Sequence, residues 1–186
     1  MRYKAGLETR QKILDATRGL IADQGLEGTT IKAICKESDV LPGSFYNLFE
    51  SKEEAILTVV REAIDAVDPD PEHRGTDTLA DLVNAYIEFL TTQGDLASVY
   101  IGLAVSGRRN NVDLRGRVIR HHEGRVARFS EALGREQPSL SEEDANRRAE
   151  TLVSALNGIA LSRVLNPDFD VQTHARALLG DTLETA

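Results

Sequence analysis

Apolar residues recur at spacings of three and four along most of the 186-residue chain, and no alternating apolar–polar run persists. Helical side chains three or four positions apart lie on one face, so each segment acquires an apolar stripe that can pack against a neighbour. A half-buried strand would need the alternating pattern instead. The spacing therefore predicts an all-α fold of about nine helices.

The first helix is predicted over residues 7–24, where leucine, isoleucine and alanine side chains form one apolar stripe. Gly25 is expected to end it, because glycine readily takes the left-handed backbone of a helix C-terminus. A short second helix is predicted over 31–38, with its cap supplied by the side-chain oxygen of Thr29 or Thr30. The chain thus begins with one long and one short helix.

A third helix is predicted to begin at Pro42 and to continue through Phe49. Proline suits the first helical position, where its missing N–H would have no helical partner in any case. Ser51 and Glu54 then form an S-x-x-E pattern, in which each side chain accepts a hydrogen bond from a free backbone N–H. A fourth helix is expected to start there and to reach about residue 67.

The segment 68–77 contains two prolines, one glycine and five charged residues, and this composition predicts an exposed linker. Beyond it the apolar spacing resumes, interrupted by short polar or proline-containing stretches. Five further helices are predicted, over residues 79–92, 96–106, 114–135, 142–165 and 171–182.

The composition is typical of a soluble globular protein, with 41% apolar and 28% charged residues. No apolar run approaches the ~18 residues that a membrane-spanning helix requires. The start of the chain lacks the apolar region of a signal peptide, so we expect a cytoplasmic protein without membrane contact. The single cysteine, Cys35, has no partner for an internal disulfide and is expected to be a small buried side chain.

Charge is distributed unevenly along the chain. The formal net charge is −8, which argues against a protein that coats nucleic acid indiscriminately. Residues 1–50 are neutral, with seven basic and seven acidic side chains, whereas residues 68–186 carry 13 arginines, no lysine and 19 acids. A neutral, lysine-bearing head on an acidic body is consistent with one end that faces DNA and one that faces away.

Two short helices separated by a tight turn, after a longer helix that shares their core, form a helix-turn-helix arrangement. The second short helix can then enter a major groove about 12 Å wide. The apolar residues with the spacing to bury the core of this unit are Ile31, Ile34, Cys35, Val40, Phe45 and Phe49. The three aromatic residues Phe45, Tyr46 and Phe49 could instead all belong to one apolar stripe of a small bundle. We expect the two phenylalanines to be core residues, and Tyr46 to lie off the core face.

The residues left on the outer face are polar or small, as DNA contact requires. Gly43 lets the backbone approach the duplex, and Ser44 and Asn47 can form hydrogen bonds with base edges. Tyr46 and Lys52 have the length to reach phosphates. The candidate DNA-contacting residues are Thr30, Lys32, Pro42, Gly43, Ser44, Tyr46, Asn47 and Lys52.

The stretch GTTIKAICKESDVLPGSFYNLFESKEEAI, residues 28–56, resembles the signature of TetR-family regulators. The matching residue types are the Thr29–Thr30 pair, the 43–46 run, Phe49 and the 51–53 run. The resemblance implies a helix-turn-helix domain over 1–50 and an effector-binding and dimerisation domain over 51–186. It also implies a DNA contact by Lys32, with operator DNA and a small-molecule effector as partners. We expect no cofactor.

Three positions depart from the residues that are usual in the family. Asp39 stands where glycine is common in the turn, and aspartate tolerates the left-handed conformation. Leu41 replaces the frequent serine or threonine that caps the recognition helix, and Leu48 replaces a frequent histidine that touches phosphate. We expect the fold to be kept, and we carry over no phosphate contact to Leu41 or Leu48.

The last two predicted helices carry a broad apolar stripe, with small residues that permit close helix approach. The resemblance implies that these helices dimerise, and two-fold symmetry would place two recognition helices ~34 Å apart. The alternative is that the stripe packs inside the chain. The candidate interface residues are Leu152, Ala155, Leu156, Ile159, Arg163, His174, Leu178 and Leu179.

The middle helices carry aromatic and apolar residues that, in the resemblance, line an effector cavity. The candidates are Tyr86, Phe89, Leu90, Tyr100, Leu103, His122, Val126 and Phe129, and the alternative for each is that it belongs to the core. An arginine-rich stretch could attract an anionic effector or be a solvated face, and its members are Arg108, Arg109, Arg115, Arg117 and Arg120. The adjacent His121, His122 and Glu123 lack metal-ligand spacing, so no metal is expected.

Two functions other than a ligand-relieved repressor of a palindromic operator remain open. One is a helical protein-interaction adaptor without DNA binding, which the leucines at 41 and 48 make conceivable. The other is a helical enzyme with His122 and Glu123 as acid and base. We do not expect an enzyme, because no nucleophile, orienting partner or metal set accompanies that pair.

Overall fold

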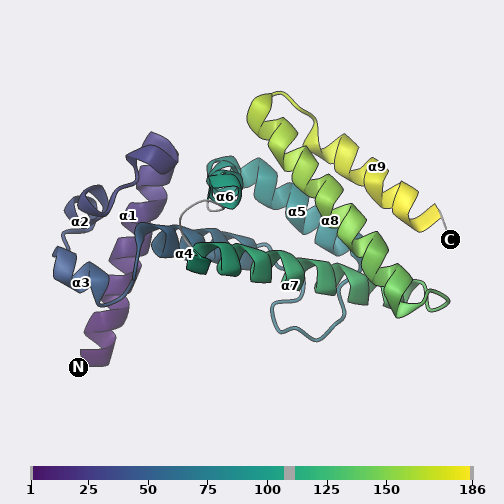
Figure 1. Cartoon of the computed structure of the whole chain (residues 1–186), viewed down its shortest axis with the longest axis horizontal. Coiled ribbons are helices and arrows are strands. Elements are labelled where there is room, and N and C mark those ends of the chain that lie inside the picture. Colours follow the sequence, from purple (N-terminus) through teal and green to yellow (C-terminus); the bar gives the residue numbers. More distant parts are fainter. Residues whose placement is uncertain (1, 107–111, 185–186) are drawn as a thin grey trace. The chain divides into compact units, whose positions relative to one another are not determined.

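The computed structural model describes residues 2–106 and 112–184, and within those ranges the chain forms nine helices and no strand (Figure 1). The all-α prediction is confirmed. In chain order the helices are α1 (Arg2–Gly28), α2 (Ile31–Ser38), α3 (Pro42–Tyr46), α4 (Lys52–Asp65), α5 (Leu79–Thr92), α6 (Gly94–Ser106), α7 (Val112–Glu136), α8 (Glu142–Leu165) and α9 (Val171–Glu184).

The chain divides into two compact units. The first comprises Met1–Ala63 and Asp95–Leu114, and the second comprises Ile64–Gly94 and Arg115–Ala186. The predicted domain boundary at residue 50 lies at the end of the helix-turn-helix motif. The first compact unit continues beyond it, because it also includes most of α4, which has buried apolar side chains. The division of DNA binding and effector binding between segments stays a prediction.

In the first unit α2 packs against α1, and α3 packs against α2 (Figure 1). Gly25 interrupts α1 with a left-handed backbone, φ 66° and ψ −167°, so the regular helix ends at the predicted position and a short continuation follows. Thr30 is the N-cap of α2, where its hydroxyl oxygen accepts a 3.1 Å hydrogen bond from Ala33 N. Ile13 of α1 and Ile34 of α2 are fully buried, whereas Leu7, at the start of the predicted stripe, is 51% exposed.

Two local predictions need correction. The third helix ends at Tyr46 rather than continuing through Phe49, although Phe49 is buried as expected. At the start of α4, Glu54 N donates to Ser51 Oγ, and the Glu54 carboxylate accepts from Glu50 N, whereas the predicted box has it accept from Ser51 N. The backbone N–H that the Glu54 carboxylate accepts from is therefore one residue earlier than in a regular capping box.

In the second unit α9 packs against both α8 and α5, and α8 and α9 run side by side (Figure 1). Thr78 and Asp81 form a complete capping box at the start of α5, and Ser141 caps α8 by accepting from Asp144 N. The bounds of α5 and α8 coincide with those predicted from the apolar spacing. Strong capping residues explain this agreement, because they fix a helix start locally.

Candidate nucleic-acid interface

The turn between α2 and α3 depends on the left-handed backbone of Asp39, which has φ 53° and ψ 43°. Its backbone N–H and that of Val40 both donate to the carbonyl oxygen of Cys35, which closes the end of α2. The predicted tolerance of aspartate at this position is confirmed. The tight turn then directs the chain into α3 within a few residues.

The start of α3 is held by its backbone alone. The carbonyl oxygen of Leu41, the N-cap residue, accepts from Ser44 N at 2.9 Å and from Phe45 N at 3.1 Å. No side chain caps the helix, and Pro42 occupies its first turn. A leucine in place of a capping hydroxyl therefore leaves α3 intact.

The aromatic residues of α3 and its C-terminal extension separate into core and surface. Phe45 is fully buried and Phe49 is 3% exposed, whereas the neighbouring Tyr46 is 58% exposed. The rings of Phe45 and Tyr46 meet edge to face, with centroids 5.7 Å apart. The buried ring thus anchors α3 to the unit, and the exposed ring projects from it.

The other candidate contact residues on α2 and α3 lie on the surface. Those that are exposed are Thr30, Lys32, Pro42, Gly43 and Asn47, and Ser44 is half-buried. A Cβ atom built on Gly43 would meet no other atom within 4 Å. The chain itself therefore imposes no steric need for glycine at this position.

Lys52 has a partner within the chain. Its Nζ donates a 3.3 Å hydrogen bond to the carbonyl oxygen of Leu26, which ties the start of α4 to the end of α1. An ammonium group has three N–H donors, so this bond leaves others for a phosphate. Contact of Lys52 with a phosphate stays a prediction, and the residue also links α4 to α1.

Two pairs of basic residues in the first unit differ in their surroundings. Arg10 and Arg18 both pair with Glu62, at 3.4 and 3.8 Å, and the guanidinium of Arg10 also lies 5.8 Å from the centre of the Phe49 ring. Lys32 and Lys36, in contrast, have exposed side chains on α2. The lysines of α2 are therefore better placed than Arg10 and Arg18 to contact a polyanion.

The eight effector-site candidates are divided between the two units. Tyr100 and Leu103 belong to the first unit, and the other six belong to the second. Within the second unit Tyr86 and His122 are half-buried, and the buried members are Phe89, Leu90, Val126 and Phe129. Of the arginine-rich stretch, Arg108 and Arg109 lie outside the described residues, as does the side chain of Arg115.

Arg125, which was not among the predicted site residues, joins three helices of the second unit. Its guanidinium lies 4.9 Å from the centre of the Tyr86 ring, and its Nη1 donates to Asn157 Oδ1 at 3.0 Å. Tyr86 donates through its hydroxyl to the carbonyl oxygen of Leu156. Within the described part of the chain, Nη2 of Arg125 is buried without a hydrogen-bond partner. The spacing from His122 to Arg125 to Phe129 is the sequence signal that could have revealed it.

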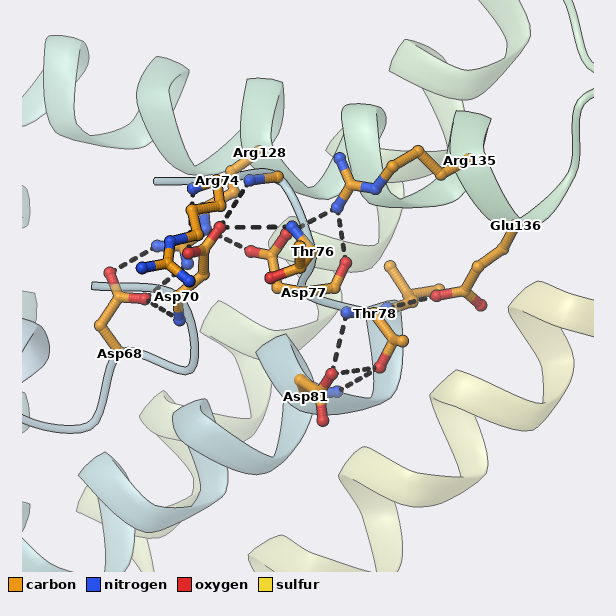
Figure 2. Close-up of polar contacts among 12 residues, drawn as sticks. Asp68, Asp70, Arg74, Thr76, Asp77, Thr78, Asp81, Arg128, Arg135 and Glu136 are labelled. Atoms are coloured by element: carbon orange, nitrogen blue, oxygen red, sulfur yellow. Dashed lines mark hydrogen bonds and ion pairs between the residues drawn. The ribbon is translucent and has the colours of Figure 1, made fainter. Parts of the chain in front are cut away.

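The segment 68–77 is exposed at most of its positions, as its composition predicts, but Asp70 and Asp77 are buried and Asp68 is half-buried. Arg128 donates to both carboxylate oxygens of Asp68, at 2.5 and 2.6 Å, and to Asp77 at 2.6 Å (Figure 2). Arg135 also pairs with Asp77, whose side chain is only 3% exposed. Asp70, buried in the same segment, accepts backbone N–H bonds from the turn that ends with Thr76. Distant arginines on α7 thus fix this segment, which local composition cannot reveal.

This ion cluster gives the second unit a pH-dependent stability. The Arg128 guanidinium lowers the pKa of Asp68, with a smaller contribution from the Asp70 N–H. A carboxyl with a lowered folded-state pKa stabilises above its unfolded pKa of about 4 and loses that contribution as pH falls through the folded value. We expect Asp68→Asn to lower the melting temperature at pH 7, and the difference from the parent to shrink as the pH falls below about 4, measured by circular dichroism.

The matched control for that experiment is Asp168→Asn, at an exposed position of the same unit. It should leave the melting temperature close to the parent value at every pH. A deficit for Asp68→Asn that stays constant between pH 7 and pH 3 would show that its carboxylate does not provide the linkage.

The candidate dimer residues are of two kinds. Leu152, Leu156 and Ile159 are buried within the single chain, at 3%, 0% and 7% exposure. For these three residues the alternative, that the apolar stripe packs inside the chain, therefore holds. The half-buried members are Ala155, Arg163, Leu178 and Leu179, and His174 is exposed and stacked on Phe169. The exposed apolar residues of α8 lie near its C-terminal end and are Leu161, Val164 and Leu165.

Residues 13–57 match the model of the family described as bacterial regulatory proteins, tetR family. The HTH-type transcriptional regulator UidR of Escherichia coli K12 is 38% identical over 52 residues, which are 28% of this chain and 26% of UidR. The repressor KstR2 of Mycolicibacterium smegmatis is 36% identical over 56 residues, 30% and 27% of the two chains. The matches thus span about a quarter of the curated relatives' length.

Solved structures resemble the chain over most of its length. A transcriptional regulator from Rhodococcus sp. Rha1 has a TM-score of 0.73 at 20% identity, covering 95% of this chain and 97% of its own. FadR of Bacillus subtilis, in complex with stearoyl-CoA, has a TM-score of 0.68 at 20% identity, covering 92% and 96%. SmeT, the repressor of a Stenotrophomonas maltophilia multidrug efflux pump, has 0.70 at 21%, covering 96% and 91%. At these identities the likeness is one of fold.

The described residues contain neither a candidate membrane span nor a candidate metal site. None of the helices there combines the length and apolar character that crossing a bilayer demands. No group of three or more histidine, cysteine, aspartate or glutamate side chains in the same residues could hold a metal ion.

Proposed function

We propose that this chain, which carries the DNA-binding domain of TetR-family regulators at residues 13–57, is a repressor that a small molecule releases from a palindromic operator. The observation that supports it most directly is the division of α3 into a buried anchor and an exposed face. Phe45 fixes the helix to its unit, while Pro42, Gly43 and Tyr46 project outward. A helix held in this way can enter a major groove without rearranging its own core.

The contacts we assign follow the chemistry of each exposed group. Gly43 allows the backbone to approach the duplex, and Asn47 and Ser44 offer hydrogen bonds to base edges. Lys32 and the hydroxyl of Tyr46 reach phosphates, which fix the position of the protein on the DNA. The acidic body is assigned no phosphate contact, because it would be repelled.

The experiment that tests this function is operator selection from random duplex DNA, followed by binding measurements at increasing salt. We expect a palindromic site and a dissociation constant that rises steeply with salt, because binding of phosphates releases counterions. Failure to select any site, even at low salt, would reject the repressor and favour the adaptor without DNA binding.

We further propose a homodimer built on α8 and α9, as palindromic DNA requires. Because Leu152, Leu156 and Ile159 are buried within one chain, the surface assigned to the partner moves to Leu161, Leu165 and the half-buried α9 leucines. Leu165 is 76% exposed at the end of α8, which is unfavourable for a large apolar side chain in water. A two-fold partner would cover it.

Replacing Leu165 with arginine should therefore shift the protein from dimer to monomer, measured by sedimentation velocity, because it places a charge in an apolar contact. Operator affinity should fall with it, since the second recognition helix is lost. The control is Ile119→Arg on α7, another apolar residue that is 41% exposed. An unchanged dimer in the Leu165 variant would place the interface elsewhere.

The effector is proposed to bind in the second unit, near Tyr86 and Arg125. The buried Nη2 of Arg125 favours a ligand with a carboxylate or carbonyl oxygen, because such a group would satisfy its unused N–H donors. A ligand can release DNA only by its difference in affinity between two states of the protein. A screen of small molecules for release of the selected operator tests this proposal.

A transcriptional regulator acts in the cytoplasm and needs no catalytic centre, and we propose both for this protein. Substrate turnover that is lost on His122→Ala would contradict the second assignment.

A further inference from the structure

The side chain of Leu41 is the most unusual feature of the proposed DNA-binding face. It is 76% exposed, as much as any large apolar residue in the described part of the chain. Leaving a leucine in water forgoes the free energy that burial would provide. Its neighbours Pro42 and Gly43 are exposed too, so Leu41 lies within the face assigned to DNA.

The position of Leu41 is nevertheless fixed. Its carbonyl oxygen accepts hydrogen bonds from Ser44 N and Phe45 N, and Phe45 is fully buried. The backbone at Leu41 is extended, with φ −69° and ψ 147°. The leucine is therefore an apolar group held on a rigid base at the start of α3.

A phosphate contact at the start of α3 would need hydrogen-bond donors, but the surface there is apolar. The side chain of Leu41 has no hydrogen-bond donor, and Pro42 has no backbone N–H. In the major groove the edges of the bases are mostly polar, and the largest apolar group on them is the 5-methyl group of thymine. That methyl group is the natural partner for an exposed leucine.

We infer that Leu41 contacts a thymine 5-methyl group in each half of the operator and thereby selects thymine at that position. The inference rests on the proposed function, because it requires α3 to enter the major groove. Burial of one methyl group contributes roughly 0.8 kcal/mol, which corresponds to about a fourfold change in affinity. Two half-sites would give a change of about 15-fold.

The test uses the selected operator with deoxyuridine in place of thymidine, one symmetric pair of positions at a time. Uracil differs from thymine only by the missing methyl group, so base pairing and the polar edge are kept. We expect one pair of positions at which the parent protein loses about 15-fold in affinity. The variant Leu41→Ala should bind the thymine and uracil operators at that pair with equal affinity.

The control variant is Ile119→Ala, which removes an exposed apolar side chain from α7. It should keep the full sensitivity to the methyl group. The melting temperature of Leu41→Ala should stay close to that of the parent, because its side chain makes little contact within the chain.

Two outcomes would overturn the inference in different ways. Specific binding that is indifferent to every thymine methyl group, or equal sensitivity in Leu41→Ala and the parent, would reject the contact and leave the repressor intact. Absence of specific binding to any duplex would reject both the contact and the proposed function.

Discussion

Gly43→Glu should reduce operator affinity more than 100-fold while leaving the fold as stable as before or slightly more so. In the complex the carboxylate would lie where the backbone approaches the DNA, and like charges in contact cost several kcal/mol, with each 1.4 kcal/mol a factor of about ten. In the free protein a Cβ at this position meets no atom within 4 Å. Glutamate is also a better helix former than glycine and is favoured in a first turn.

Two measurements check this prediction, operator binding by fluorescence anisotropy and thermal unfolding by circular dichroism. The matched control is Gly124→Glu on α7, an exposed glycine whose added Cβ also meets no atom within 4 Å. It brings the same charge to the second unit and should leave affinity nearly unchanged. Tight binding by the Gly43 variant would mean that α3 does not approach DNA through this residue.

Phe45→Ala should lower the free energy of unfolding by about 3–5 kcal/mol, the usual cost of removing a buried aromatic side chain. Phe45 is fully buried, and its ring packs against Phe49 with centroids 5.7 Å apart. The truncation leaves a cavity beneath α3, so operator binding should weaken as a consequence of unfolding. Urea denaturation followed by circular dichroism measures the change.

The neighbouring variant Tyr46→Ala is the control, because its side chain is 58% exposed. We expect it to cost less than about 1 kcal/mol in stability. It should nevertheless weaken DNA binding by about tenfold through a lost phosphate contact. If the two variants lost stability equally, the separation of α3 into anchor and contact residues would be wrong.

Local chemistry explains why much of the fold could be predicted. Thr30, Thr78 and Ser141 each accept a backbone N–H bond three residues on, so the starts of α2, α5 and α8 depend on neighbours in sequence. Asp39 and Gly25 end helices through their own backbone conformations. Such features involve a few consecutive residues, and a pattern along the chain is sufficient to find them.

The candidate site was only partly predictable. The outward direction of Tyr46 and the burial of Phe45 follow from helical spacing, whereas the bond from Lys52 to the carbonyl oxygen of Leu26 links residues far apart in the chain. Arg125 was missed for the same reason, since its partners Tyr86 and Asn157 come from two other helices. Spacing indicates a face of a helix but not the group that meets it.

The sequence by itself determined the helices, their caps and the helix-turn-helix motif, because each depends on backbone preferences and side chains within one or two turns. Only the tertiary structure decided which polar residues are buried and which apolar residues are left exposed. The segment 68–77 is fixed by Arg128 and Arg135, and the stripe of Leu152 and Leu156 packs within the chain. Burial and ion pairing depend on segments distant in sequence, and composition alone carries no record of which segments meet.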